Sequence, residues 1–272
     1  MTTLNVPGAT LYYEVQGTGP VLLMIPGGPT DAGIFAGLAA TLADRYTVVA
    51  YDPRGNSRSV SDDPSKDQDI DVHGDDAAAL LAALTSEPAY VLGSSGGAQI
   101  GLNLAARHPE RVRALVAHEP PCVRLLPDAA ELQAAMEGVY ETYRSQGVEA
   151  GMKAFEKTIG MDSTDMEQPQ FEPTPEMLEG WARIGGNLEF FLAHGVRPIS
   201  GYVPDVETLR EGTPRVTAGI GGTSAAHQIA YRSAVALAER LGTEPVTFPG
   251  DHGGYGAHPG EFADVLHKTF TS

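Results

Sequence analysis

The sequence predicts an α/β protein whose core is a mostly parallel, doubly wound sheet and whose second part is a helical cap. Three observations lead to this fold class. Apolar segments without polar alternation, such as residues 21–25 and 46–51, suit strands that helices cover on both faces. Each segment is followed by a loop and then by helical spacing of apolar residues, which is the order of a parallel sheet. The alternation is interrupted once, by a long stretch with helical patterns only.

The interruption divides the chain into a core and a cap. The alternation of strands and helices stops after residue 121 and resumes after residue 205. We therefore predict a core made of residues 1–121 and 206–272, and a helical cap made of residues 122–205. A chain of 272 residues with 42% hydrophobic content is long enough for one large core with an insertion.

The expected elements follow the chain in order. The first two expected strands flank Pro7-Gly8, and apolar and polar residues alternate over part of the second. We therefore expect an antiparallel hairpin at the sheet edge. The expected strands are residues 2–6, 10–15, 21–25, 46–51, 89–92, 112–117, 215–220 and 246–248. The expected helices are residues 34–42, 69–84, 98–107, 227–241 and 259–270 in the core, and 129–143, 147–159 and 177–191 in the cap. An acidic loop is expected over residues 161–175.

Composition and charge limit the classes of partner. The formal net charge is −17, since 35 Asp and Glu outnumber 18 Lys and Arg, so nucleic acid and anionic membranes are repelled. A small neutral or apolar substrate fits better. The only cysteine, Cys122, excludes an intramolecular disulfide and is compatible with a reducing compartment. No basic and apolar leader pattern opens the sequence and no run of about 18 apolar residues occurs, so we expect a soluble, cytoplasmic protein; a homodimer stays open.

A nucleophile is predicted where residues 89–92 run into the motif G-S-S-G-G centred on Ser95. The pattern G-x-S-x-G places a serine on a sharp strand-to-helix turn, and Gly93 and Gly97 leave room for the turn. The pattern alone is weak in a chain with 32 Gly. Because a buried strand precedes it and an apolar helix follows it, Ser95 is the candidate nucleophile.

A serine nucleophile needs a base and a group that orients the base. His252 follows the last strand in a Gly-rich loop, at the edge where open α/β sheets bind ligands, and is the candidate base. The acid commonly follows the strand before the final helix and strand, but residues 219–224 contain no carboxylate. Glu119 ends an earlier strand on the same edge and is the candidate acid, with a structural tie to the cap as the alternative. If His252 faces Ser95, Asp251 beside it points the wrong way to orient it.

Two backbone N–H groups are expected to bind the oxyanion of a tetrahedral intermediate. The turn at the nucleophile supplies the N–H of Gly96. The loop after residues 21–25 supplies the N–H of Gly28, since Pro26 and Pro29 have none. The sequence contains no Walker loop, CxxC or HExxH motif, so neither a metal nor an organic cofactor is predicted.

Together these motifs resemble the α/β-hydrolase superfamily over essentially the whole chain. Within it, the sequence is similar to the fungal zearalenone lactonases in an S-S-G tripeptide at 94–96, an H-E-x-P segment at 118–121, a W-A-R segment at 181–183 and the P-G-D-H segment at 249–252. The resemblance implies that Glu119 is the triad acid and that Trp181 is a wall or hydrogen-bond donor of the substrate pocket; a place in the cap core is the alternative for Trp181. The oxyanion loop lacks that family's acidic residue and the cap diverges outside the W-A-R segment, which leaves the exact substrate open.

The expected function is hydrolysis of a carboxylic ester or lactone, with a bulky apolar lactone of the zearalenone type as the expected substrate. Ser95 attacks the carbonyl while His252, held by Glu119, transfers the proton. One alternative is a general carboxylesterase, a perhydrolase or a C–C bond hydrolase of the same fold. Another is a receptor-like protein that binds a ligand with little turnover, against which the complete set of Ser, His and Glu argues.

Overall fold

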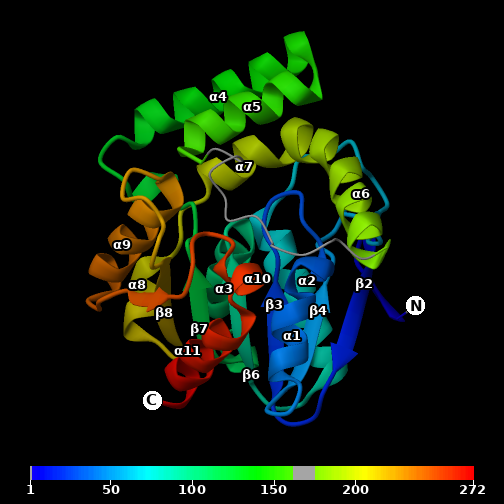
Figure 1. Cartoon of the computed structure of the whole chain (residues 1–272), viewed down its shortest axis with the longest axis vertical. Helices are drawn as coiled ribbons and strands as arrows, with labels where there is room; N and C mark the ends of the chain where they lie inside the picture. Colours follow the sequence, from blue (N-terminus) through cyan, green and yellow to red (C-terminus); the bar gives the residue numbers. More distant parts are fainter. Residues whose placement is uncertain (1, 162–174) are drawn as a thin grey trace.

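The computed structural model describes residues 2–161 and 175–272 and is organised around one mixed sheet (Figure 1). Its strands are β1 (Thr2–Val6), β2 (Ala9–Gln16), β3 (Val21–Ile25), β4 (Thr47–Tyr51), β5 (Val60–Ser61), β6 (Ala89–Ser94), β7 (Val112–His118), β8 (Arg215–Gly221) and β9 (Val246–Phe248). Their order across the sheet is β1-β2-β4-β3-β6-β7-β8-β9, and β5 pairs with β2. From β4 to β9 all neighbours are parallel, whereas β2 pairs antiparallel with β1, β4 and β5. The predicted sheet and its edge hairpin are confirmed; β5 was not predicted.

Helices flank the sheet and form the cap. They are α1 (Ala36–Leu42), α2 (Ile70–Leu84), α3 (Gly96–Arg107), α4 (Ala129–Gln146), α5 (Val148–Ile159), α6 (Pro175–Phe190), α7 (Val196–Gly201), α8 (Val206–Glu211), α9 (Ile229–Leu241), α10 (Gly254–Ala257) and α11 (Pro259–Thr271). All the predicted helices are present, with ends shifted by a few residues at most, while the short α7, α8 and α10 were not predicted. Within the described ranges, no helix combines the length and apolarity that a membrane span needs.

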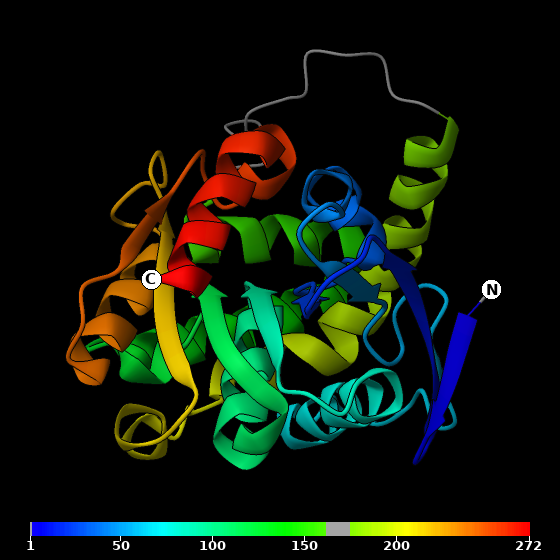
Figure 2. The same ribbon diagram turned by 90° about the horizontal axis from the view of Figure 1, so that it is seen from below.

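Two hydrophobic cores fill the two faces of the sheet. Successive residues of β3 point to opposite faces, as a pleated strand requires: Leu22 packs in the core under α1 and α11, and Leu23 packs in the core under α2, α3 and α9. Figure 2 shows α1 and α11 on one side of the sheet and α2 and α3 on the other. Burial on both faces explains why these strands lack polar alternation.

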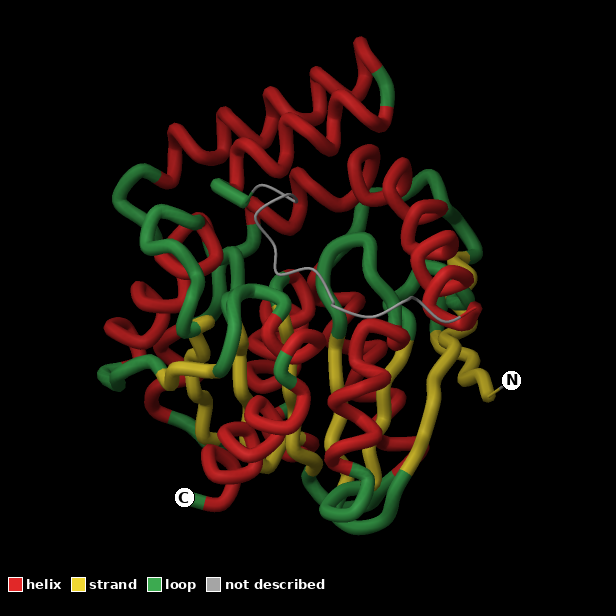
Figure 3. Tube along the Cα trace, in the orientation of Figure 1, coloured by secondary structure: helices red, strands yellow, loops and turns green. Residues whose placement is uncertain are grey.

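The cap lies over the end of the sheet at which α3 begins, and the described part of it is helical (Figure 3). A π-helical turn, Phe191–Gly195, joins α6 to α7. A third hydrophobic cluster joins the cap helices to each other and to Val123 and Ile229, and includes Met136, Val139 and Leu192. The predicted boundaries at 121/122 and 205/206 stay a prediction, and the acidic loop expected at 161–175 falls almost entirely outside the described residues.

Candidate active site

Ser95 lies on a strained turn between β6 and α3. Its backbone has φ 55° and ψ −128°, a region that residues with a side chain rarely adopt. The residues two before and two after Ser95 must be glycine because no Cβ fits there. A Cβ on Gly97 would collide with the carbonyl oxygen of Ile25, and one on Gly93 would lie 2.6 Å from the Cα of Ala98. The amide of Ser95 donates to the carbonyl of His118, 2.9 Å away. The sharp turn predicted from the glycine spacing is therefore present.

Glu119 and His252 meet at the carboxyl ends of the parallel strands. Nδ1 of His252 lies 2.6 Å from Oε2 of Glu119, and the other carboxylate oxygen accepts the amide of Gly221 at 2.9 Å. Glu119 is fully buried and has φ 47°, and its own amide donates to the carbonyl of Gly219 at 2.9 Å. The end of β8, the place where this architecture commonly carries the acid, thus provides a hydrogen-bond donor to the carboxylate that follows β7.

The electrostatics of this pair favour an ionised carboxylate. Burial by itself raises the pKa of Glu119, but the hydrogen bond and charge of His252 outweigh it, helped by His118 and the amide of Gly221, and the pKa falls to about 2. Complete burial lowers the pKa of the neighbouring His118 to about 4. Glu119 can therefore hold the Nδ1–H of His252 and leave Nε2 as the proton acceptor.

Asp251 has a different partner. Its Oδ1 accepts the amide of Gly253 at 2.8 Å, which closes the turn after the base. This agrees with the prediction that Asp251 does not orient His252.

The predicted oxyanion donors lie side by side. A Cβ built on Gly96 would be 3.2 Å from the amide nitrogen of Gly28, and one on Gly27 would be 2.6 Å from the amide nitrogen of Gly96. Gly28 has φ 56°, a left-handed conformation that favours glycine there. The N–H of Gly96 belongs to the first turn of α3 and has no acceptor within the helix. Both glycines border the cavity that Ser95 and His252 share.

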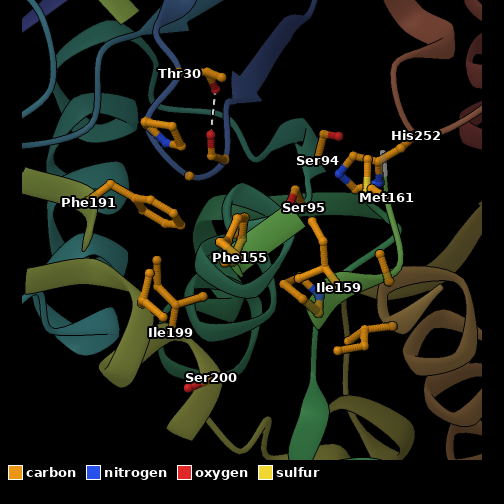
Figure 4. Close-up of a pocket in the computed structure, with 18 of the residues that line it drawn as sticks. Thr30, Ser94, Ser95, Phe155, Ile159, Met161, Phe191, Ile199, Ser200 and His252 are labelled. Atoms are coloured by element: carbon orange, nitrogen blue, oxygen red, sulfur yellow. Dashed lines mark hydrogen bonds between the residues drawn. The ribbon is translucent and has the colours of Figure 1, made fainter. Parts of the chain in front are cut away.

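Ser95 and His252 line a cavity of about 250 Å³ between the core and the cap (Figure 4). The cap contributes Phe155, Ile159 and Phe191, and the two phenylalanine rings meet edge to face with centroids 5.1 Å apart. Apart from the groups at Ser95 and His252, the lining residues are chiefly apolar. The site therefore has a polar end that can react and an apolar wall that can exclude water.

Trp181 is not brought to this cavity. Its side chain is 49% exposed and does not border the cavity. Two residues further along α6, Arg183 bonds the buried Asp31 at 3.0 Å, and residues two apart point to nearly opposite sides of a helix. The contact between Arg183 and Asp31 thus turns Trp181 outward, and the substrate-pocket role implied by the resemblance has no support in this geometry.

Two asparagines near the oxyanion loop were not singled out from the sequence. Asn56, in the loop after β4, and Asn187, in α6, are buried and bond the carbonyl groups around Gly28. Asn187 lies far from these partners in sequence, so no local pattern signals the contact. Within the described residues, no cluster of three or more His, Cys, Asp or Glu side chains is arranged to hold a metal ion.

Comparison with known proteins assigns the family. A family model described as the alpha/beta hydrolase fold matches residues 20–159, just over half of the chain. The chain belongs to this α/β-hydrolase family. An uncharacterised hydrolase of Bacillus subtilis (strain 168), YraK, is 40% identical over 271 residues, which cover 97% of this chain and 94% of the relative. The chain is therefore a hydrolytic enzyme, as the sequence predicted.

Two further similarities bear on the predictions. Zearalenone hydrolase of Bionectria ochroleuca is 25% identical over 275 residues, covering 98% of this chain and 97% of the relative, so the resemblance to that group is confirmed as a distant one. A thermophilic esterase from Thermogutta terrifontis superposes with a TM-score of 0.74 over 99% of this chain and 96% of that chain. With 22% identity, this similarity supports the fold alone.

Proposed function

We propose that this α/β hydrolase is a serine hydrolase that cleaves a carboxylic ester or lactone through an acyl-enzyme. The observation that carries the proposal is the 2.6 Å contact between His252 Nδ1 and Glu119 Oε2, made by a base that shares its cavity with Ser95. A pair of this kind orients the imidazole and stabilises its protonated form, which a weak serine nucleophile requires. The strained turn at Ser95 supports the same role.

The proposed reaction has two halves. Ser95 Oγ attacks the carbonyl carbon while His252 takes the hydroxyl proton at Nε2, and the N–H groups of Gly28 and Gly96 bind the negative oxygen. Collapse of the tetrahedral intermediate breaks the bond to the leaving alcohol, which receives the proton from His252. Water then attacks the acyl-enzyme with the same base, and the acid product leaves. In a lactone the alcohol and the acid remain parts of one ring-opened product.

An apolar lactone of the zearalenone type is the proposed substrate. The support is the apolar cavity wall, the charge of −17, which disfavours anionic substrates, and the distant similarity to a zearalenone hydrolase. A general carboxylesterase with the same catalytic residues is the main rival within the fold.

The test is chromatography with mass detection of zearalenone incubated with the wild-type enzyme, Ser95→Ala and Glu119→Ala. The proposal expects a ring-opened product from the wild type, none from Ser95→Ala and much slower formation by Glu119→Ala. If zearalenone survives but an aryl ester is cleaved through Ser95, the catalytic assignment stands and the lactone assignment is wrong. If the wild type cleaves neither compound, the proposed hydrolysis of esters is wrong.

A further inference from the structure

The loop that carries the Gly28 amide is held by side chains outside the catalytic set. Each carbonyl of residues 27–30 accepts a hydrogen bond. The carbonyl of Gly27 accepts from Thr30, those of Gly28 and Thr30 accept from Asn56, and that of Pro29 accepts from Asn187. A loop whose carbonyls are all bound has its peptide planes fixed, and the N–H groups in those planes are fixed with them.

Thr30 acts on the peptide that contains the Gly28 amide. Its hydroxyl donates to the carbonyl of Gly27 at 2.5 Å, the contact drawn as a dashed line in Figure 4. The Thr30 amide donates to the same oxygen at 3.2 Å. Because this peptide is planar and trans, the N–H of Gly28 points opposite to the carbonyl of Gly27. Holding that carbonyl therefore sets the direction of the N–H.

Asn56 fixes the following part of the loop. Its side-chain amide donates to the carbonyl of Gly28 at 3.0 Å and to that of Thr30 at 2.9 Å. Asn56 is 1% exposed, so water does not compete for these bonds. A single side chain thus bridges the loop across the left-handed turn at Gly28.

Asn187 connects the same loop to the cap. It lies on α6, is 5% exposed, and donates from Nδ2 to the carbonyl of Pro29 at 2.7 Å and to Ser57 Oγ at 2.9 Å. Its Oδ1 accepts the amide of Ser57 at 2.8 Å, and Ser57 has φ 47°. The side chain uses all its hydrogen-bonding groups on the core, so these bonds form only when α6 lies in this position.

We propose that Thr30, Asn56 and Asn187 are positioning residues for the oxyanion-binding amide of Gly28, and that Asn187 makes this amide depend on the seating of the cap. The inference rests on the proposed function, since it concerns how an oxyanion is bound. Without a seated cap the enzyme would keep Ser95 and its base but would stabilise the tetrahedral intermediate less. Acylation would then be efficient only when the cap covers the substrate.

The test compares variants that remove one donor with variants that keep it. Asn187→Asp keeps the shape and the acceptor for the Ser57 amide but loses the side-chain NH₂ that donates to the Pro29 carbonyl and to Ser57 Oγ. Thr30→Val loses the hydroxyl that Thr30→Ser keeps. Loss of a whole oxyanion donor costs about 10²–10³ in kcat, so a loosened donor should cost less, about 10-fold. We expect Asn187→Asp and Thr30→Val to lower kcat for an aryl ester about 10-fold with KM within about twofold, and Thr30→Ser to retain the wild-type kcat.

Arg183→Gln is the matched control for a loosened cap. It removes another contact between α6 and the core, the bond to Asp31, without touching a carbonyl of residues 27–30. We expect a lower melting temperature but an unchanged kcat. A second measurement uses an aryl boronic acid, whose tetrahedral adduct with Ser95 places an oxygen at the two amides. Its inhibition constant should rise in Asn187→Asp and Thr30→Val as kcat falls, while inhibition by the alcohol product stays constant.

Several results would overturn the inference. If Asn187→Asp and Thr30→Val keep their kcat and boronate affinity while Ser95→Ala is inactive, the proposed function stands and the positioning role is wrong. If Arg183→Gln loses as much kcat as Asn187→Asp, general loosening of the cap explains the effect and the specific role is wrong. If the wild type has no esterase activity, or Ser95→Ala keeps it, the proposed function fails and this inference fails with it.

Discussion

The core and the cap contribute to the cavity in different ways. Core residues are placed by the backbone: Ser95 by a turn with φ 55°, and Glu119 by bonds to Gly219 and Gly221 at the ends of parallel strands. Cap residues reach the cavity chiefly as apolar side chains, and α6 is tied to the core through Asn187 and Arg183. On the proposed function, the reacting groups belong to the core, whereas the cap shapes the cavity and, through Asn187, holds the loop that carries the Gly28 amide.

The largest expected effect is the loss of activity when the candidate nucleophile, a core residue, is removed. Ser95→Ala removes the attacking oxygen but leaves the cavity, so hydrolysis of any ester should fall by at least about 10⁴-fold, as for other serine hydrolases that lose a triad member. Binding of the substrate should change little. Initial rates and equilibrium binding of the same ester measure the two quantities. Activity of Ser95→Ala within about 10-fold of the wild type would contradict the assignment of the nucleophile to Ser95 in the core.

Glu119→Gln tests the orientation of the base, which also belongs to the core. An amide cannot stabilise the protonated imidazole, so kcat should fall by about 10³-fold or more with an unchanged KM. Asp251→Asn is the matched control, because Asp251 is next to the base and its Oδ1 accepts a backbone amide that an asparagine can also accept. We expect this control to keep kcat within about threefold. Equal losses in the two variants would contradict the assignment of Glu119.

Phe155→Ala tests the cap. Phe155 is partly buried and forms part of the apolar wall, and a bulky substrate that completes its burial would gain up to about 1.5–3 kcal/mol of apolar contact. KM for a bulky apolar lactone or ester should rise about 10-fold, whereas kcat/KM for a small acetate ester should stay within about threefold. Steady-state kinetics with both substrates measure the difference. An equal fall in kcat/KM for the bulky and the small substrate would mean that Phe155 affects the chemical step rather than the choice of substrate.

The pH dependence of the free energy of unfolding tests whether the buried carboxylate of Glu119 is ionised. Its pKa in the folded state is about 2, below the ordinary value of 4.5, so its ionised form stabilises the fold above pH 4.5 and that contribution is lost as pH falls toward 2. Wild type should therefore lose more free energy of unfolding between pH 4.5 and pH 3 than Glu119→Gln does. Urea unfolding at several pH values gives both slopes. Identical slopes would show that Glu119 is not ionised beside His252.

The smallest expected effect concerns Trp181, which the resemblance places in the substrate pocket and the structure places outside it. Because its side chain is 49% exposed and does not border the cavity, Trp181→Ala should change kcat and KM for zearalenone or an aryl ester by less than about twofold. This variant is also the aromatic control for Phe155→Ala. A large rise in KM would restore the role that the resemblance implies.

Sequence reasoning succeeds best where local geometry limits the residue types. Ser95 could be named as the candidate nucleophile because Gly93 and Gly97 are needed for the turn, and Gly28 as a candidate donor because Pro26 and Pro29 in the same loop have no N–H. Glu119 is the candidate acid on weaker signals, the end of a strand and the order along the chain, to which the family resemblance adds.

Other features depend on contacts between distant segments and have no local signal. Asn187 bonds Pro29 and Ser57, and the sequence does not encode that pairing in any short pattern. The rotation of α6, which decides where Trp181 points, is coupled to Arg183 and its distant partner Asp31. The helical character of the cap could be predicted from periodicity, but the face that each helix turns to the cavity could not.

The acyl-enzyme is the most direct test of the central claim, that Ser95 acts as a nucleophile with His252 and Glu119. The measurement is the mass of the intact protein, and of its Ser95 peptide, after acid quenching during turnover of an aryl ester. The account predicts an added acyl group on Ser95 that is absent from Ser95→Ala and forms more slowly in Glu119→Gln. Turnover with the acyl group on another residue, or undiminished turnover by Ser95→Ala, would contradict it.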